Sequence, residues 1–223
     1  MWVKICANTN LEDARLAAEL GADAVGFVFA ESKRQVNAEQ VAAITRELPP
    51  SVAKVGVFTS TDVDEILQAA NTAGLTAIQL HSDFDPDLVD AIVAGSKGML
   101  RVLQVIDVPE EASAAKLESA LRTTLEHPYV EAALLDASHG GMSGGTGKTF
   151  DWAATAAMVR RVQAETGSRV IVAGGLRAEN VVDAISAFHP WGVDVASGVE
   201  ATPGKKDVAR LKGFLAASRQ ATH

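Results

Sequence analysis

The sequence alternates eight times between a short run of strand-forming residues and a longer Ala-rich stretch with the apolar spacing of a helix. Such alternation predicts parallel strands joined by right-handed helical crossovers. Eight units in 223 residues favour one α/β domain over residues 1–223, closed as a single (β/α)8 TIM barrel. The alternative is an open doubly wound sheet, which usually has fewer strands at this length. The expected strands are 2–6, 23–29, 52–58, 77–80, 100–106, 132–135, 169–172 and 193–195.

Turn and cap residues separate these strands from the expected helices. The first helix is expected between Asn10 as N-cap and Gly21 as the residue beyond its end. Pro49 and Pro50 stop the second, and Pro86 starts the fourth. The remaining expected helices are 62–73, 112–126, 151–165, 178–188 and 205–217.

Composition restricts the function. The formal net charge of -8 argues against nucleic acid as a partner but permits a small phosphorylated ligand. A single cysteine cannot form an internal disulfide, which fits a reducing compartment. No signal-peptide pattern or membrane-spanning apolar run is present, so we expect a cytoplasmic protein without membrane contact. No cluster has metal-ligand spacing, and both a monomer and a homodimer are plausible.

Small residues follow the last two strands, where a barrel of this kind carries its function. Gly174 and Gly175 come after the seventh strand, and Ser197 and Gly198 after the eighth. Bare backbone N–H groups there can converge on an anion. Two such segments on adjacent strands predict a phosphate site more strongly than one Gly-Gly turn does.

Two groups able to transfer protons follow strands on different sides of the barrel mouth. Cys6 ends the first strand and Asp136 the sixth. A ligand held between them could receive a proton from one and lose a proton to the other, provided that the environment shifts both pKa values. The residues alone leave two plainer interpretations open: Cys6 as a small buried apolar side chain, and Asp136 as a helix cap or loop anchor.

The long glycine-containing loop 137–149 follows the sixth strand. Its glycines and its place beside the catalytic face make it a candidate lid, with an ordinary surface loop as the alternative.

Several segments together resemble the phosphoribosylanthranilate isomerases of tryptophan biosynthesis. They match in order from Lys4 to Asp207, over nearly the whole chain. The segments are KICANTN from Lys4, GADAVGFVF from Gly21, KVGVF from Lys54, QLH from Gln79, LLD from Leu134, GGTGKTFDW from Gly144, AGGL from Ala173 with ENV from Glu179, and VDVASGVEATPGKKD from Val193.

The resemblance implies an Amadori rearrangement of N-(5-phosphoribosyl)anthranilate, without metal or cofactor. Asp136 matches the general acid that opens the furanose ring, and Cys6 the general base that removes the C2 proton. Arg34 matches the residue that faces the anthranilate carboxylate, and His81 and Asp194 are assigned to the substrate as well. The phosphate residues implied by the family are Gly174, Gly175, Ser197 and Gly198.

The chain departs from the family pattern at Ala7, where glycine is usual. Lys205 and Lys206 are interpreted as a solvated pair at a helix start. The alternatives are a histidine-pathway or bifunctional aminoaldose isomerase, and a non-catalytic barrel that binds phosphorylated metabolites. An indole-glycerol-phosphate synthase fits poorly because Lys4 and Lys54 precede their strand ends.

Overall fold

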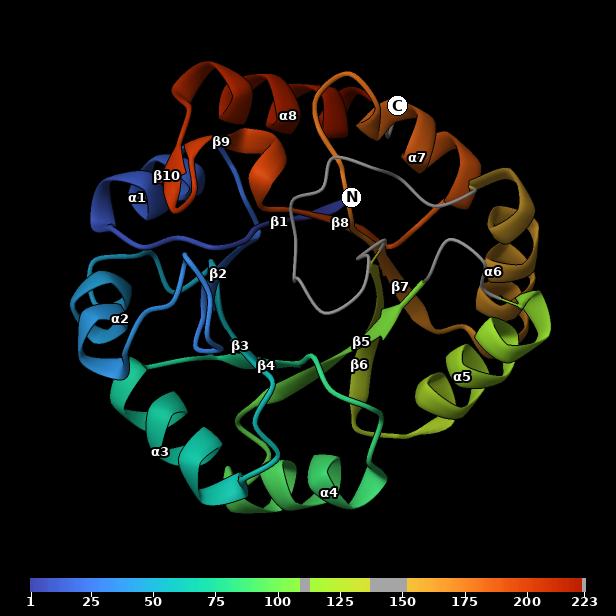
Figure 1. The fold of residues 1–223 in the computed structure, drawn as a ribbon, viewed down its shortest axis with the longest axis horizontal. Helices are drawn as coiled ribbons and strands as arrows, with labels where there is room; N and C mark the ends of the chain where they lie inside the picture. Colours follow the sequence, from blue (N-terminus) through green and yellow to red (C-terminus); the bar gives the residue numbers. More distant parts are fainter. Residues whose placement is uncertain (109–112, 137–151, 222–223) are drawn as a thin grey trace.

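The computed structural model describes residues 1–108, 113–136 and 152–221. Eight parallel strands close into a barrel in chain order, and helices surround them (Figure 1). This confirms the predicted fold. The strands are β1 Trp2–Ile5, β2 Ala24–Val28, β3 Ala53–Phe58, β4 Ala77–Leu80, β5 Arg101–Asp107, β6 Val130–Asp136, β7 Arg169–Val172 and β8 Gly192–Val195. The helices are α1 Leu11–Glu19, α2 Ala38–Thr45, α3 Val63–Ala73, α4 Pro86–Gly95, α5 Ala114–Glu126, α6 Trp152–Thr166, α7 Val181–Phe188 and α8 Val208–Gln220.

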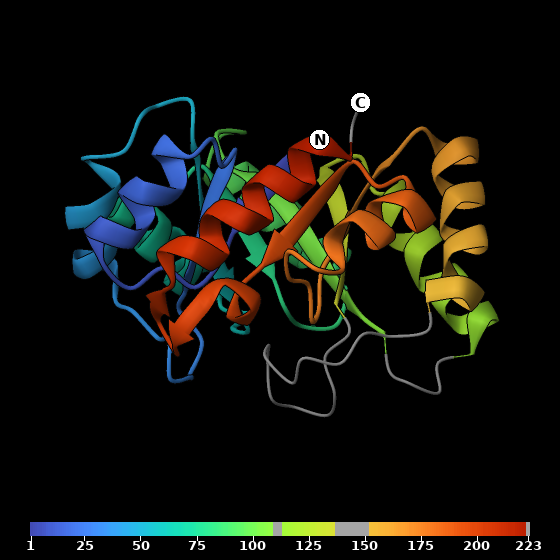
Figure 2. The ribbon, with the colours of Figure 1, turned by 90° about the horizontal axis from the view of Figure 1, so that it is seen from above.

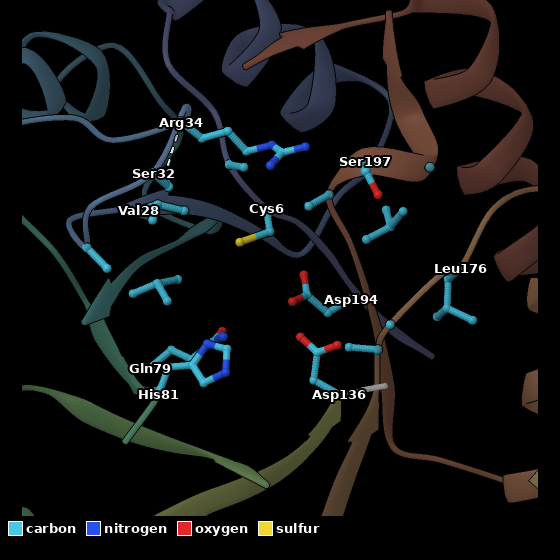
Figure 3. Close-up of a pocket in the computed structure, with 18 of the residues that line it drawn as sticks. Cys6, Val28, Ser32, Arg34, Gln79, His81, Asp136, Leu176, Asp194 and Ser197 are labelled. Atoms are coloured by element: carbon cyan, nitrogen blue, oxygen red, sulfur yellow. Dashed lines mark hydrogen bonds between the residues drawn. The ribbon is translucent and has the colours of Figure 1, made fainter. Parts of the chain in front are cut away.

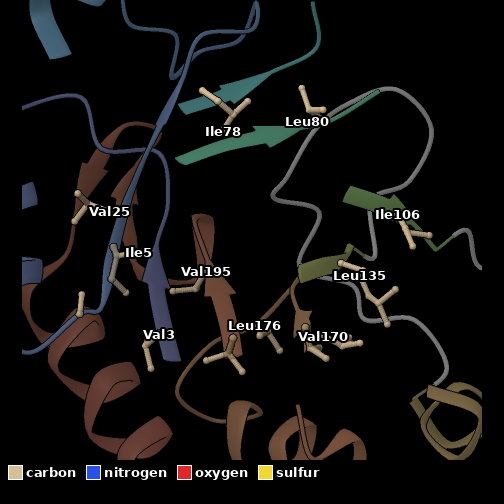
Figure 4. Close-up of a cluster of buried hydrophobic side chains, with 14 of the residues drawn as sticks. Val3, Ile5, Val25, Ile78, Leu80, Ile106, Leu135, Val170, Leu176 and Val195 are labelled. Atoms are coloured by element: carbon tan, nitrogen blue, oxygen red, sulfur yellow. The ribbon is translucent and has the colours of Figure 1, made fainter. Parts of the chain in front are cut away.

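Each strand sends alternate side chains to opposite faces, which gives the barrel two apolar cores. The outward-facing core packs the strands against the helices and includes Val3, Ile5, Val25 and Leu135 (Figure 4). The inward-facing core fills the barrel and contains Ala24, Val55, Ala77, Leu103, Val105, Ala132, Leu134, Ile171 and Ala173. Its small and medium side chains suit the narrow interior of an eight-stranded barrel.

Two tryptophans close the end of the barrel at which the strands begin. Trp2 and Trp191 stack with their ring centroids 4.9 Å apart. The Arg169 guanidinium lies 4.7 Å from the centroid of the Trp191 ring, a cation–π contact. Because apolar groups fill this end, polar chemistry inside the barrel is confined to the opposite end, where the strands finish.

The structure corrects the expected start of the last helix. Residues 205–206 do not begin a helix: they form a short strand, β10 (Lys205–Lys206), which pairs antiparallel with β9 (Glu200–Thr202). The turn between them contains Gly204 at φ 81°, a left-handed conformation that suits glycine. Helix α8 begins only at Val208, because the Asp207 carboxylate accepts a hydrogen bond from the Arg210 N–H.

Three further expectations fall on residues outside the described part of the chain: the loop 137–149 and the first residues of the helices expected at 112 and 151.

In the side view, the N-terminus and the β9–β10 hairpin lie at opposite ends of the barrel (Figure 2). The hairpin is therefore at the end where the strands finish.

The cap at Asp207 gives a direct test of where α8 begins. Asp207→Ala is expected to lower the free energy of unfolding by about 1 kcal/mol, because it removes the acceptor for a helix-terminal N–H. Urea denaturation measures the loss. Ser113→Ala is the matched control, since Ser113 precedes α5 and its side chain makes no capping hydrogen bond. Equal effects of the two substitutions would contradict the assignment of Asp207 as the cap.

Candidate active site

One cavity lies at the end of the barrel where the strands finish, and side chains from several strands point into it (Figure 3). It contains every residue that the sequence singled out for catalysis or binding, although their chemical roles stay predictions. These residues are Cys6, Arg34, His81, Asp136, Gly174, Gly175, Asp194, Ser197 and Gly198.

The rim formed after β7 and β8 is made of backbone. Gly174 and Gly175 adopt positive φ values of 83° and 64°, which glycine tolerates at no steric cost. The Asn180 side chain donates to the Gly175 carbonyl at 3.0 Å and fixes the turn. After β8 the chain enters a single 3₁₀ turn, η1 (Ser197–Val199).

Close packing joins the two halves of this rim. A Cβ on Gly198 would lie 1.8 Å from the Leu176 carbonyl oxygen, so only glycine fits there. The absence of side chains leaves backbone N–H groups accessible on both segments, an arrangement suited to an anion.

Cys6 follows β1 directly and is buried, yet its side chain borders the cavity. It is therefore not simply enclosed in hydrocarbon. Burial raises the pKa of the Cys6 thiol above its ordinary value, and the Lys4 ammonium opposes this rise. The negative charge of Asp194 acts in the same direction as burial, while the positive charge of Lys206 acts with Lys4.

Asp136 ends β6 and faces the same cavity from another side (Figure 3). Burial raises the pKa of its carboxyl group to about 6, with opposition from the charge of His81 and further elevation from Asp194 and Asp107. A carboxyl group with this pKa keeps part of its protons near neutral pH, as a general acid requires.

His81 and Asp107 form a pair beside Asp136. His81 Nε2 lies 3.1 Å from Asp107 Oδ1. This hydrogen bond raises the pKa of His81, and the charge of Asp136 adds to the effect. These contacts favour the protonated form of His81, which lies close to the Asp136 carboxyl group.

Asp194 is held from the interior of the barrel. Lys4 Nζ donates to Asp194 Oδ2 at 2.9 Å, with both side chains buried. The other oxygen, Asp194 Oδ1, has no hydrogen-bond partner among the described residues, and the same is true of Asp136 Oδ1 and Gln79 Oε1. Buried polar atoms without partners are costly, so these three atoms mark where a bound ligand would make hydrogen bonds.

Arg34 reaches the cavity from the segment after β2, but its guanidinium is already engaged. Its Nε and Nη2 donate to both carboxylate oxygens of Glu200, at 2.7–3.1 Å. This bidentate contact raises the pKa of Arg34 and fixes the plane of the guanidinium at the cavity wall. A ligand carboxylate would therefore meet an arginine whose orientation is set in advance.

The interpretation of Lys206 as a solvated residue was wrong. Its side chain is fully buried, Nζ donates to the Cys6 carbonyl, and the same ammonium lies 3.5 Å from Glu200 Oε1. Lys205 fits the interpretation better: it is half-exposed and pairs with Glu12 and Asp13.

Sequence reasoning thus missed three buried charged residues around the site: Lys4, Glu200 and Lys206. The only available signal was their place in matched segments, since Lys4 belongs to KICANTN and the other two to the segment from Val193.

The departure from the family pattern at Ala7 has a consequence for the backbone. Ala7 adopts φ 60°, a left-handed conformation that costs a residue with a Cβ roughly 1–2 kcal/mol. Glycine would adopt it without that cost.

Among the described residues, no group of three or more His, Cys, Asp or Glu side chains is arranged to hold a metal ion. Within the same residues, no helix has the length and apolarity needed to cross a membrane.

A parallel eight-stranded barrel with a glycine-rich rim after its last two strands is typical of (β/α)8-barrel enzymes that act on small phosphorylated molecules. Comparison with known proteins makes this specific. The chain belongs to the N-(5'-phosphoribosyl)anthranilate isomerase family, whose model matches residues 3–217.

Individual relatives agree with this assignment. An N-(5'-phosphoribosyl)anthranilate isomerase of Pelobacter propionicus is 42% identical over 98% of this chain and 95% of its own length. The crystal structure of phosphoribosyl anthranilate isomerase from Thermotoga maritima is 39% identical, covers 99% of both chains and gives a TM-score of 0.84. A phosphoribosyl anthranilate isomerase solved with reduced 1-(o-carboxyphenylamino)-1-deoxyribulose 5-phosphate is 37% identical over 99% of both chains, with a TM-score of 0.81.

The contact between Gly198 and Leu176 predicts a strict requirement for glycine. Gly198→Ala is expected to lower the free energy of unfolding by about 1–3 kcal/mol, because the backbone of the rim must move to admit a methyl group. Chemical denaturation measures this. Gly213→Ala in α8 is the control: its Cβ would meet only an ordinary contact at 3.5 Å, so no loss of stability is expected. An unchanged stability for Gly198→Ala would refute the close contact.

The raised pKa of Asp136 predicts a pH-dependent effect on stability. The folded pKa is about 6 and the ordinary value 3.8, so between these pH values the unfolded chain ionises first and the free energy of unfolding falls as pH rises. Asp136→Asn removes this penalty and is expected to gain up to about 3 kcal/mol over the original chain above pH 6, and little below pH 4. Urea denaturation from pH 4 to 7 tests this, and a difference that stays constant over that range would contradict it.

Proposed function

We propose that the chain catalyses the Amadori rearrangement of N-(5-phosphoribosyl)anthranilate to 1-(2-carboxyphenylamino)-1-deoxyribulose 5-phosphate in tryptophan biosynthesis. Family membership supports the reaction. The observation that carries the mechanism is the arrangement of Cys6 and Asp136, which face one cavity from β1 and β6 beside the glycine rim.

In the proposed mechanism the protonated Asp136 carboxyl donates to the furanose ring oxygen. The C1–O bond breaks, and the ring opens to a protonated Schiff base. The pKa of about 6 for Asp136 supports its role as the acid, because an ordinary aspartate would hold almost no proton at neutral pH. The neighbouring His81, paired with Asp107, stabilises the carboxylate that remains.

The second step is removal of the C2 proton by the Cys6 thiolate. The electron pair of the C–H bond then forms the C1–C2 double bond of an enolamine, and the positive charge on nitrogen is neutralised. The enolamine tautomerises to the ketone, so the sequence needs no net oxidant or reductant.

Binding roles are assigned to the remaining cavity residues. The proposal gives the phosphate to the backbone N–H groups of Gly174, Gly175 and Gly198, with Ser197, and the position of all four residues on the cavity wall supports it. Arg34 faces the anthranilate carboxylate. The relative solved with reduced 1-(o-carboxyphenylamino)-1-deoxyribulose 5-phosphate supports a ligand of this class, which carries both a phosphate and a carboxylate.

Two wider features accompany this proposal. We treat residues 1–223 as one catalytic domain, since a single closed barrel accounts for the strands β1–β8. A cytoplasmic location is supported by the single cysteine. Both a monomer and a homodimer fit the proposal, and the Thermotoga maritima relative is a dimeric enzyme.

Substitution of the two proton-transfer groups tests the mechanism. Cys6→Ser and Asp136→Asn are each expected to reduce kcat/KM for phosphoribosylanthranilate by about 10²–10⁴-fold, the usual cost of losing a general base or acid. Loss of anthranilate-ring fluorescence measures turnover. Asp83→Asn is the matched control, an exposed carboxylate on the same face of the barrel that does not border the cavity. Near-normal activity of either catalytic variant would refute its assigned role.

Complementation separates the alternatives. Growth of a tryptophan auxotroph but not of a histidine auxotroph is the expected result, and rescue of the histidine strain would show the bifunctional or histidine-pathway activity. Saturable binding of the substrate without turnover would instead identify a non-catalytic phosphate-metabolite binder.

A further inference from the structure

We propose that Lys4 is a positioning residue for the base: its buried ammonium, anchored by Asp194 inside the barrel, stabilises the Cys6 thiolate. The inference rests on the proposed function, in which Cys6 removes a proton. Lys4 is not among the residues that line the cavity, and it lies on β1 two residues before Cys6, so it is not placed against the substrate.

The geometry begins with the alternation of β1. Trp2, Lys4 and Cys6 alternate with Val3 and Ile5, which belong to the outer core. The side chain of Lys4 is therefore directed into the barrel, and it is completely buried there. A lysine in such a place is rare unless its charge is balanced by a partner.

The partner comes from the strand that closes the barrel. Lys4 is paired in register with Asp194 of β8, and Nζ donates to Oδ2 at 2.9 Å. Burial alone would lower the pKa of Lys4, but the Asp194 carboxylate and the Cys6 sulfur more than offset this, so the pKa is raised. The pairing with Asp194 therefore favours the ammonium form of Lys4 inside the barrel.

Space for the lysine beside the thiol is provided by Gly26 on β2. A Cβ at this position would lie 2.7 Å from Cys6 Sγ and 3.0 Å from Lys4 Cε. Both side chains therefore rest against the same bare stretch of backbone. The lysine stem and the thiol are brought together on one side of the barrel, so the ammonium acts on Cys6 at short range.

Charges from several elements face Cys6. Among those close to it, Asp194 of β8 disfavours the thiolate, whereas Lys4, Lys206 of β10 and Arg34 favour it. Two of these cations have other partners: Arg34 is held by Glu200, and Lys206 Nζ donates to the Cys6 carbonyl. Lys4 makes the largest contribution that opposes burial.

Two further titratable groups face the thiol from across the cavity: His81, which follows β4, and Asp136 of β6 (Figure 3). They belong to the opposite, acid side of the site. The pKa of Asp136 itself is lowered slightly by Lys4, so the same ammonium acts on both proton-transfer groups.

The test is a titration of the thiol itself. Cys6 is the only cysteine, so the thiolate absorbance near 240 nm and the rate of alkylation by iodoacetamide report on it alone once a Cys6→Ser blank is subtracted. Lys4→Met keeps the length of the side chain and removes its charge. We expect the pKa of Cys6 to rise by about 1–3 units, the usual effect of losing a neighbouring opposite charge. Alkylation at pH 7 should fall about tenfold for each unit.

Two further variants distinguish an effect on the pKa of Cys6 from an effect on folding. Lys4→Met/Asp194→Asn removes both buried charges, and it should still raise the pKa of Cys6, by less, because the effect of Lys4 is the larger. Lys54→Met is the matched control: this buried lysine lies on β3, its Nζ donates to the Pro49 carbonyl, and no change in the Cys6 titration is expected. Circular dichroism establishes that each variant is folded.

The kinetic readout separates positioning from a structural role. The ascending limb of kcat/KM against pH should move to higher pH in Lys4→Met together with the thiol titration, with activity recovering at alkaline pH. A folded variant with an unshifted Cys6 titration would overturn the role of Lys4. A wild-type chain that fails to turn over phosphoribosylanthranilate would overturn the proposed function instead, whatever the thiol titration shows.

Discussion

The hydrogen-bonded pairing of β8 with β1 is the interaction on which the rest of the structure depends. It closes the barrel, and it brings Asp194 beside Lys4 across 190 residues of sequence separation. It also sets the glycine rim after β7 and β8 next to Cys6. Without this pairing, the thiol would not lie beside the glycine rim, and a lysine would be left in an apolar interior with no counter-charge.

Burial has opposite consequences for Asp136 and Cys6, the two groups that are proposed to transfer protons. Removing water favours the neutral form of each, which gives Asp136 the proton that an acid needs but disfavours the thiolate that a base needs. The charges around the two groups differ. Cations gather around Cys6, while the surroundings of Asp136 include the carboxylates of Asp194 and Asp107. The cations around Cys6 oppose the effect of burial on its thiol, although the pKa of Cys6 stays above its ordinary value.

Much of the fold could be predicted from the sequence, because its strands and helices depend on local periodicity. The alternation of strands and helices, the cap at Asn10 and the proline at the start of α4 are short-range features, and the structure has them all. Placing the site was equally direct, since residues that follow parallel strands must meet at one end of a barrel.

The features that escaped prediction depend on contacts between distant segments. Lys205 and Lys206 look like the start of a solvated helix, yet pairing with β9 turns Lys206 inward. Arg34 is fixed by Glu200, 166 residues away. No local pattern specifies such pairs, because charged residues are mostly exposed and only the assembled barrel decides which are buried.

The pairing of β8 with β1 also has a consequence for a chain that is still being synthesised. During synthesis from the N-terminus, β1 is among the first segments to emerge and β8 among the last. Until β8 is present, Lys4 has no Asp194 carboxylate to balance its charge, so β1 cannot pack in the barrel as it does in the complete fold. A nascent chain that ends before residue 192 therefore carries an unprotected thiol and an open sheet edge together, and the final segment covers both at once.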